Sequence, residues 1–144
     1  MSTKEKQDQV VESMRRWQKV ENAAVVQTAK IIDETENPLI RLVMEIIQRD
    51  SHMHHRVQQA IIDSFTRESV YIPVDDLAKT WDSIEKHIAI EKKTIELAKA
   101  NLESLAGTKN VVQQYLLSYL LADEEKHDKL LANLALIKKG MFPY

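Results

Sequence analysis

Residues 120–131 read Leu-Leu-Ala-Asp-Glu-Glu-Lys-His-Asp-Lys-Leu-Leu, and this stretch carries both a helical pattern and an interruption of it. Apolar residues recur here at steps of three and four, which predicts a helix that buries one stripe. Glu124 and His127 fill the stripe positions between Leu120 and Leu131. An ionised carboxylate in an apolar core costs several kcal/mol unless it is paired or bound to a metal. The stretch therefore predicts a helix whose buried face carries chemistry.

The same spacing fills four segments, separated by few turn-forming residues. The 144 residues include only two glycines and three prolines, which predicts long uninterrupted elements. Asn37-Pro38 and the aspartates after Pro73 are typical helix starts, and Gly107-Thr108 is typical of a helix stop followed by a new cap. The expected helices cover residues 3–34, 38–65, 76–105 and 108–139. Because no segment alternates with period two, the sequence predicts a single all-α domain over 1–144, a four-helix bundle.

Composition excludes several classes of function. The absence of cysteine excludes disulfide scaffolds, thiolate zinc sites, iron–sulfur clusters and a cysteine nucleophile. A net charge of −2 disfavours a nucleic-acid partner, which usually requires a basic surplus. No apolar run is long enough for a membrane span or a secretion signal. We expect a soluble protein of the cytoplasm with neither nucleic-acid nor membrane partners.

Polar residues interrupt the other three stripes as well. Glu21 replaces a core position of the first segment, Glu91 one of the third, and His54 one of the second. The last two, like Glu124, stand about 16 residues into their helices, or roughly 24 Å, so they can meet at one level. Carboxylates gathered there would repel one another unless a divalent cation neutralised them. Carboxylate oxygen and imidazole nitrogen together are common metal ligands, so the pattern predicts a metal site of Glu21, His54, Glu91, Glu124 and His127.

For any one of these residues, a hydrogen-bonded polar group without a metal is the alternative interpretation. The set is more specific because it is repeated within the chain. Glu21 precedes Ser51 by 30 residues, and Glu91 precedes Glu124 by 33. Residues 49–55 also align with residues 122–128, and each segment carries a histidine three residues after Ser51 or Glu124. The pattern indicates an internal duplication.

Over nearly its whole length the chain resembles the rubrerythrin branch of the ferritin-like superfamily, in the pattern Glu … Ser-x-x-His … Glu … Glu-x-x-His. The resemblance implies a ferritin-like bundle of two antiparallel helix pairs around a dinuclear iron centre. Glu21 and Glu91 would be terminal carboxylates, Glu124 a bridging carboxylate, and His54 and His127 imidazole ligands. It further implies that the protein is a di-iron oxidoreductase that oxidises iron or reduces peroxide. It also implies a homo-oligomer, which we expect to be a dimer.

The chain departs from this family at two positions. Ser51 stands where a bridging glutamate is expected, and Thr94 where many rubrerythrins carry a further glutamate. Asp50 or water could compensate for Ser51; otherwise the site holds one metal, or manganese or zinc in place of iron. His87, four residues before Glu91, is either an additional ligand or a partly exposed histidine. The alternative function is a non-enzymatic bundle with a structural zinc site or a purely polar core, acting as an interaction module.

The link between the second and third segments decides the topology. A ferritin-like bundle needs the chain to cross the length of the bundle between residues 66 and 76. These eleven residues can span about 36 Å when extended, and the stretch Val70-Tyr71-Ile72-Pro73-Val74 favours an extended path. We expect this crossover, with a simple up-and-down loop as the alternative.

Overall fold

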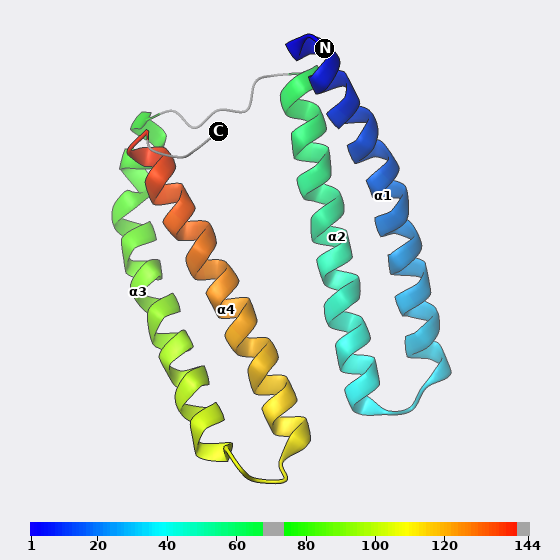
Figure 1. Cartoon of the computed structure of the whole chain (residues 1–144), viewed down its shortest axis with the longest axis vertical. Helices are drawn as coiled ribbons and strands as arrows, with labels where there is room; N and C mark the ends of the chain where they lie inside the picture. Colours follow the sequence, from blue (N-terminus) through cyan, green and yellow to red (C-terminus); the bar gives the residue numbers. More distant parts are fainter. Residues whose placement is uncertain (68–73, 141–144) are drawn as a thin grey trace. The chain divides into compact units, whose positions relative to one another are not determined.

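The computed structural model describes residues 1–67 and 74–140, and all regular structure within these ranges is helical (Figure 1). This confirms the all-α class and the four helices. The chain divides into two compact units, Met1–Tyr71 and Ile72–Tyr144. Each unit is a helical hairpin. The first contains α1 (Thr3–Glu34) and α2 (Pro38–Thr66), and the second contains α3 (Val74–Leu105) and α4 (Val111–Lys138).

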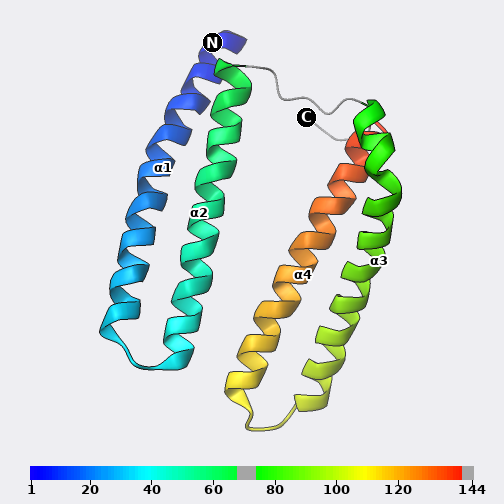
Figure 2. The ribbon, with the colours of Figure 1, turned by 180° about the vertical axis from the view of Figure 1, so that it is seen from behind.

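Both helices of the first hairpin begin at side-chain caps. The Ser2 hydroxyl accepts from the Glu5 amide and the Glu5 carboxylate accepts from the Ser2 amide, which forms a capping box. The Asn37 side chain accepts from the amides of Leu39 and Ile40, with Pro38 in the first turn as predicted. Because only residues 35–37 separate the helices, α2 turns back directly along α1 (Figure 2).

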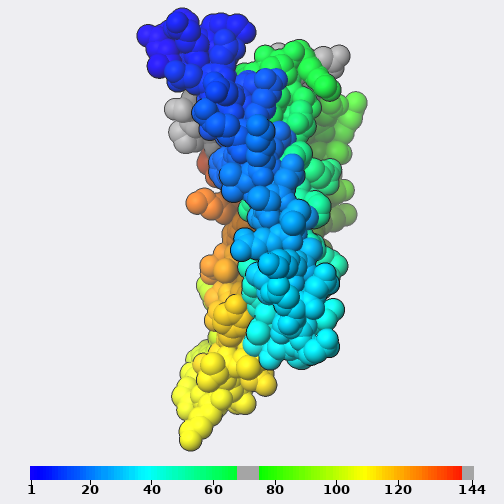
Figure 3. Space-filling model, turned by 90° about the vertical axis from the view of Figure 1, so that its right-hand side faces the viewer, coloured from blue at the N-terminus to red at the C-terminus, as the bar shows by residue number. Residues whose placement is uncertain are grey.

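Polar side chains hold the two helices of this hairpin in register. The Gln18 amide donates to the carbonyl of His55 on α2, and the Gln48 amide donates to the carbonyl of Val25 on α1. The buried positions are also mostly polar: Val11, Glu21, Thr28, Ser51, Gln58 and Ile62. Several large apolar side chains of α1, by contrast, lie exposed on the hairpin surface, part of which Figure 3 shows with α1 in blue facing the viewer.

The second hairpin has a longer connection between its helices. Gly107 adopts a φ of +74°, a left-handed conformation that ends α3 and that a side chain would strain. The buried residues of α3 include Leu77, Glu91 and Ala98. Near the end of α4, the Lys138 Nζ lies 4.3 Å from the ring centroid of Trp81, a cation–π contact between the two helices.

Two helix starts differ from their predicted positions. α3 begins at Val74, so Asp75 and Asp76 lie inside its first turn, where acidic groups favour the helix dipole, rather than capping it. α4 begins at Val111, three residues after the predicted start. The Thr108 hydroxyl donates to the carbonyl of Leu105 at the end of α3, and its oxygen accepts from the side chain of Asn110, the N-cap residue of α4. Thr108 therefore joins the two helix ends and does not itself cap α4.

The burial pattern repeats between the hairpins. On α1, Glu21 and Thr28 are buried, and 70 residues later Glu91 and Ala98 are buried on α3. This agreement supports the internal duplication. The predicted extended link over 66–76 is too long, because Thr66 is the last residue of α2 and residues 74–76 belong to α3. Residues 68–73 lie outside the described residues, so the crossover and the assembly of the helices into one bundle stay predictions.

In the described part of the chain, no helix combines the length and apolar character needed to cross a membrane.

Candidate metal centre

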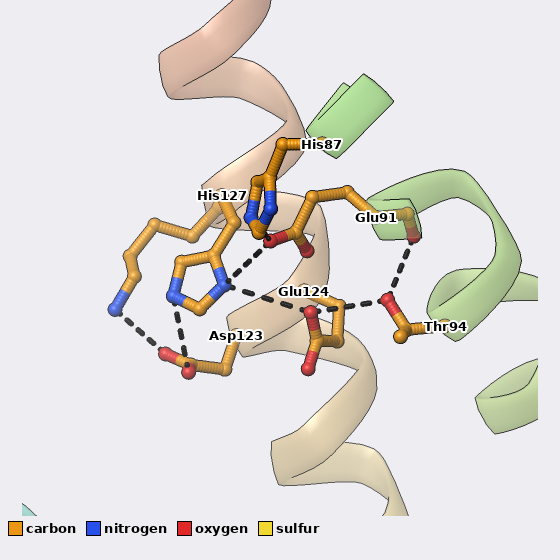
Figure 4. Close-up of polar contacts among 7 residues, drawn as sticks. His87, Glu91, Thr94, Asp123, Glu124 and His127 are labelled. Carbon is orange, nitrogen blue, oxygen red and sulfur yellow. Dashed lines mark hydrogen bonds and ion pairs between the residues drawn. The ribbon is translucent and has the colours of Figure 1, made fainter. Parts of the chain in front are cut away.

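Three of the predicted ligands meet in the middle of the second hairpin. Glu91 projects from α3, and Glu124 and His127 project from successive turns of α4 (Figure 4). One ligand atom from each lies within 4.8 Å of the other two. The His127 Nδ1 is 3.5 Å from Glu91 Oε1 and 3.5 Å from Glu124 Oε2. In a tetrahedral zinc site with bonds near 2.1 Å, neighbouring ligand atoms are about 3.4 Å apart. The two separations from His127 Nδ1 therefore match the edges of a metal-ligand polyhedron, and all three ligand atoms lie within 4.8 Å of one another.

The other nitrogen of His127 faces an acidic group. Its Nε2 lies 3.4 Å from Asp123 Oδ2, and the second oxygen of Asp123 accepts from Lys126 at 2.6 Å. Metal-binding histidines commonly donate their remaining N–H to a carboxylate, which fixes the ring and its tautomer. Asp123 is thus placed to leave Nδ1 of His127 as the metal-binding nitrogen.

Two residues of α3 contact the carboxylates directly. His87 Nε2 lies 2.8 Å from Glu91 Oε1, one helical turn away. The Thr94 hydroxyl, which lies 2.8 Å from the carbonyl of Glu91, also donates to Glu124 Oε2 at 3.1 Å. Thr94 therefore contacts Glu124 from the position where the sequence resemblance would place another glutamate.

The electrostatic environment favours the ionised form of Glu91. Hydrogen bonding with the Glu124 carboxyl, the bond from His87 and the nearby charge of His127 lower the pKa of Glu91 below its ordinary value of 4.5, while burial acts in the opposite direction. A bond between the two carboxyls needs a proton on one of them. When both are ionised, Glu91 Oε2 is buried without a hydrogen-bond partner. The site then has charge and a lone pair that a cation would satisfy.

A cavity of about 560 Å³ opens beside these groups. Glu91, Glu124 and the imidazoles form its polar side, and its apolar side consists of Ile90, Leu130 and Leu131. Ile90 and Leu130 are 54% and 62% exposed, so the cavity is open to solvent and a cation can reach the ionisable groups directly. The arrangement can hold a divalent ion and leave room for a small molecule beside it.

The first hairpin brings the other two predicted ligands together. His54 Nδ1 lies 3.3 Å from Glu21 Oε1, and Gln58 Nε2 donates to the same oxygen at 3.4 Å. Ser51, three residues before His54, is buried. Asp50 is exposed and therefore does not replace the missing carboxylate. Of the buried polar residues described in this group, Glu21 carries a carboxylate, whereas Ser51 and Gln58 are uncharged.

The structure thus brings the five predicted ligands together as two groups, one in each hairpin. A single centre made from both groups stays a prediction. Two participants were missed from the sequence: Gln58 and Asp123. Each lies four residues from a predicted histidine, on the same helix face, and this spacing is the sequence signal that makes each a candidate.

Comparisons with models of known protein families, with curated protein sequences and with solved structures find no match to this chain.

Proposed function

We propose that this protein binds a divalent transition-metal ion through Glu91, Glu124 and His127. The observation that carries the proposal is the convergence of two carboxylates and an imidazole from two helices, with ligand atoms within 4.8 Å of one another. The buried, unpartnered Oε2 of Glu91 supports it because such an oxygen is costly to bury without a compensating cation or donor. The support of His127 by Asp123 is a second feature typical of metal sites.

The ligand types restrict the metal. Oxygen and nitrogen donors without thiolate suit iron, manganese and zinc. Two carboxylates neutralise a divalent ion, which removes the repulsion between Glu91 and Glu124. Iron is the metal that the sequence resemblance favours, and it would supply redox chemistry at this site. The protein's own residues would hold the ion and keep His127 in its binding tautomer.

The sequence resemblance extends this proposal to a modified dinuclear centre. Under this hypothesis Glu21 and His54 add ligands to a ferritin-like bundle with an extended crossover, which oxidises iron or reduces peroxide. Each hairpin has the exposed apolar surface that such a bundle would bury. Trp17 is 51% exposed in the first hairpin, and Leu120 is 47% exposed in the second. Apolar exposure of this extent is typical of surfaces that become covered.

A non-enzymatic protein with one structural metal ion is the second candidate. The first hairpin favours it, because Ser51 is buried in place of a carboxylate and Asp50 remains exposed. With one carboxylate the Glu21 group offsets less positive charge than the Glu91 group. Metal stoichiometry and redox turnover separate the two candidates.

The first experiment measures metal content and affinity. The protein is purified, depleted with a chelator and titrated calorimetrically with ferrous, manganous and zinc ions. We expect at least one equivalent of metal to bind to the parent protein. In Glu124→Gln the metal affinity should fall 100-fold or more, which corresponds to about 2.7 kcal/mol of binding free energy. Glu125→Gln is the matched control, because Glu125 is the exposed neighbour of Glu124. Absence of binding for all three ions, or equal effects of the two substitutions, would overturn the proposal.

The second experiment tests the redox extension. Protein loaded with ferrous ion is mixed with peroxide, and the ferric absorbance is followed against free ferrous ion. Faster oxidation in the protein, at two irons per chain, supports the dinuclear centre. One tightly bound ion without acceleration assigns the protein to the structural-metal candidate.

A further inference from the structure

We propose that His87 is a fourth ligand, so that the second hairpin alone provides a complete site of two imidazoles and two carboxylates. This inference rests on the proposed metal binding at Glu91, Glu124 and His127. It assigns to His87 a role that neither the repeated motif nor the resemblance predicts. With a divalent ion, the two carboxylates and two neutral imidazoles would give a site of zero net charge.

The position of His87 on α3 places it at the site. It precedes Glu91 by four residues, so both side chains lie on the same face of the helix one turn apart. Its Nε2 approaches Glu91 Oε1 to 2.8 Å, and the ring lines the same cavity as Glu124 and His127 (Figure 4). The imidazole is therefore directed toward the ligands and away from the rest of the helix surface.

The ring is also able to make the adjustment that coordination requires. A contact of 2.8 Å is a hydrogen bond, whereas two atoms bound to the same zinc ion are about 3.4 Å apart. The His87 side chain is 55% exposed, so solvent and not packed side chains surrounds much of it. His87 is not among the three residues whose ligand atoms lie within 4.8 Å of one another, so its ring must turn from Glu91 toward Glu124 and His127 before it can bind the same ion.

The duplicated half of the chain provides an internal comparison. Trp17 stands 70 residues before His87 and precedes Glu21 by four residues, as His87 precedes Glu91. Indole cannot act as a metal ligand, because its N–H is only a donor. The first hairpin has therefore neither the additional imidazole nor the second carboxylate. Both differences favour metal binding entirely within the second hairpin.

The alternative role for His87 is to orient Glu91 without touching the metal. Loss of such a partner commonly lowers metal affinity 10–100-fold, so reduced affinity alone does not identify a ligand. The number of imidazoles bound to the ion does, because it differs between the two roles. X-ray absorption at the zinc edge measures this number in the full chain.

We therefore compare zinc-loaded parent protein with His87→Ala, His127→Ala and His52→Ala. If His87 is a ligand, the parent has two bound imidazoles and each of the first two variants has one. His52→Ala is the matched control, since His52 is exposed on α2, and it retains two. Zinc affinity should fall at least 10-fold in His87→Ala and remain unchanged in the control.

A parent spectrum with one imidazole that His87→Ala leaves unchanged would overturn the inference while leaving the proposed metal binding intact. Failure of the parent protein to bind zinc, iron or manganese would instead overturn the proposed function and the inference with it. Circular dichroism of each variant confirms that the helices are retained, and the exposure of His87 makes this the expected result.

Discussion

The two hairpins share a framework of buried positions but differ in the chemistry placed on it. Glu21 and Glu91 occupy equivalent positions, each buried and each in contact with a histidine of the following helix. Around them the two hairpins differ. The first has Trp17, Ala24, Ser51 and Gln58, and the second has His87, Thr94, Glu124 and Leu131. The comparison shows that a repeated helical hairpin can retain a buried carboxylate while changing the groups that compensate its charge.

In the first hairpin the side-chain amide of Gln58 compensates part of the charge of Glu21. Gln58 is only 3% exposed and donates to Glu21, but its own Oε1 has no hydrogen-bond partner. In the second hairpin two imidazoles face Glu91, and the unpartnered atom is an oxygen of the carboxylate itself. An unpartnered carboxylate oxygen attracts a divalent cation more strongly than an amide oxygen does, because it carries charge. This difference supports placing the proposed metal site in the second hairpin.

Ser51→Glu would give the first hairpin the second carboxylate that it lacks, and we expect this substitution to have the largest effect on the free energy of unfolding. Ser51 is buried three residues before His54, the spacing of Glu124 and His127. In metal-free protein the new carboxylate adds a buried charge near Glu21, and we expect the free energy of unfolding to fall by about 2–4 kcal/mol. With ferrous or zinc ion present, coordination should recover most of this loss.

Thermal melts with and without metal measure both effects. Asp50→Glu serves as the control because Asp50 is exposed, and it should change neither melt. An equal loss of stability in Ser51→Glu under both conditions would show that position 51 does not face a metal.

Acid sensitivity provides a second test, in metal-free protein. The pKa of Glu91 is lower in the folded chain than its ordinary value, so its ionised form contributes stability above about pH 4.5 that is lost as the pH falls through the folded pKa. We expect Glu91→Gln to lose stability less steeply than the parent as the pH falls below about 4.5. His87→Ala should show an intermediate slope, because His87 is one cause of the lowered pKa. Urea denaturation at each pH measures the slope, and parallel curves for all three proteins would contradict this account.

The helix caps offer a smaller and independent comparison. Asn37 and Asn110 are the N-cap residues of α2 and α4, but only Asn37 makes side-chain bonds to the helix amides. Replacing Asn37 with alanine should cost about 1 kcal/mol, and the same change at Asn110 should cost less than half of that. Urea denaturation followed by circular dichroism gives both values. A larger loss at Asn110 would show that its contact with Thr108 matters more than the missing cap.

The smallest effect is expected where α4 contacts Trp81. Lys138→Met retains the apolar stem but removes the cation–π contact, which should cost about 0.5 kcal/mol. Lys139→Met is the neighbouring control and should be neutral. The same urea experiment compares them, and indistinguishable midpoints would assign no energetic role to the contact.

The sequence was sufficient for the helices because apolar spacing and caps are local signals. Asn37 and Pro38 predicted the start of α2 correctly. The start of α4 was predicted too early, because Thr108 lies in the connection and Asn110 is the N-cap residue. The stripes predicted that all five ligands meet in one centre; the structure brings Glu21 to His54 and Glu91 to His127 within separate hairpins, and the single centre stays a prediction. Gln58 was not predicted, because a glutamine on a helix is usually solvated and only the contact with Glu21 reveals its role.

The short connection between α1 and α2 has a kinetic consequence. Only three residues separate the helices, so the entropy lost when the connection closes is small. Gln18 and Gln48 then contact groups that are 37 and 23 residues away in the sequence. These two contacts are non-local, but most hydrogen bonds of the hairpin lie within its helices, and chains dominated by such local bonds fold within microseconds to milliseconds. We therefore expect the first hairpin to form early in folding, before a metal ion has bound.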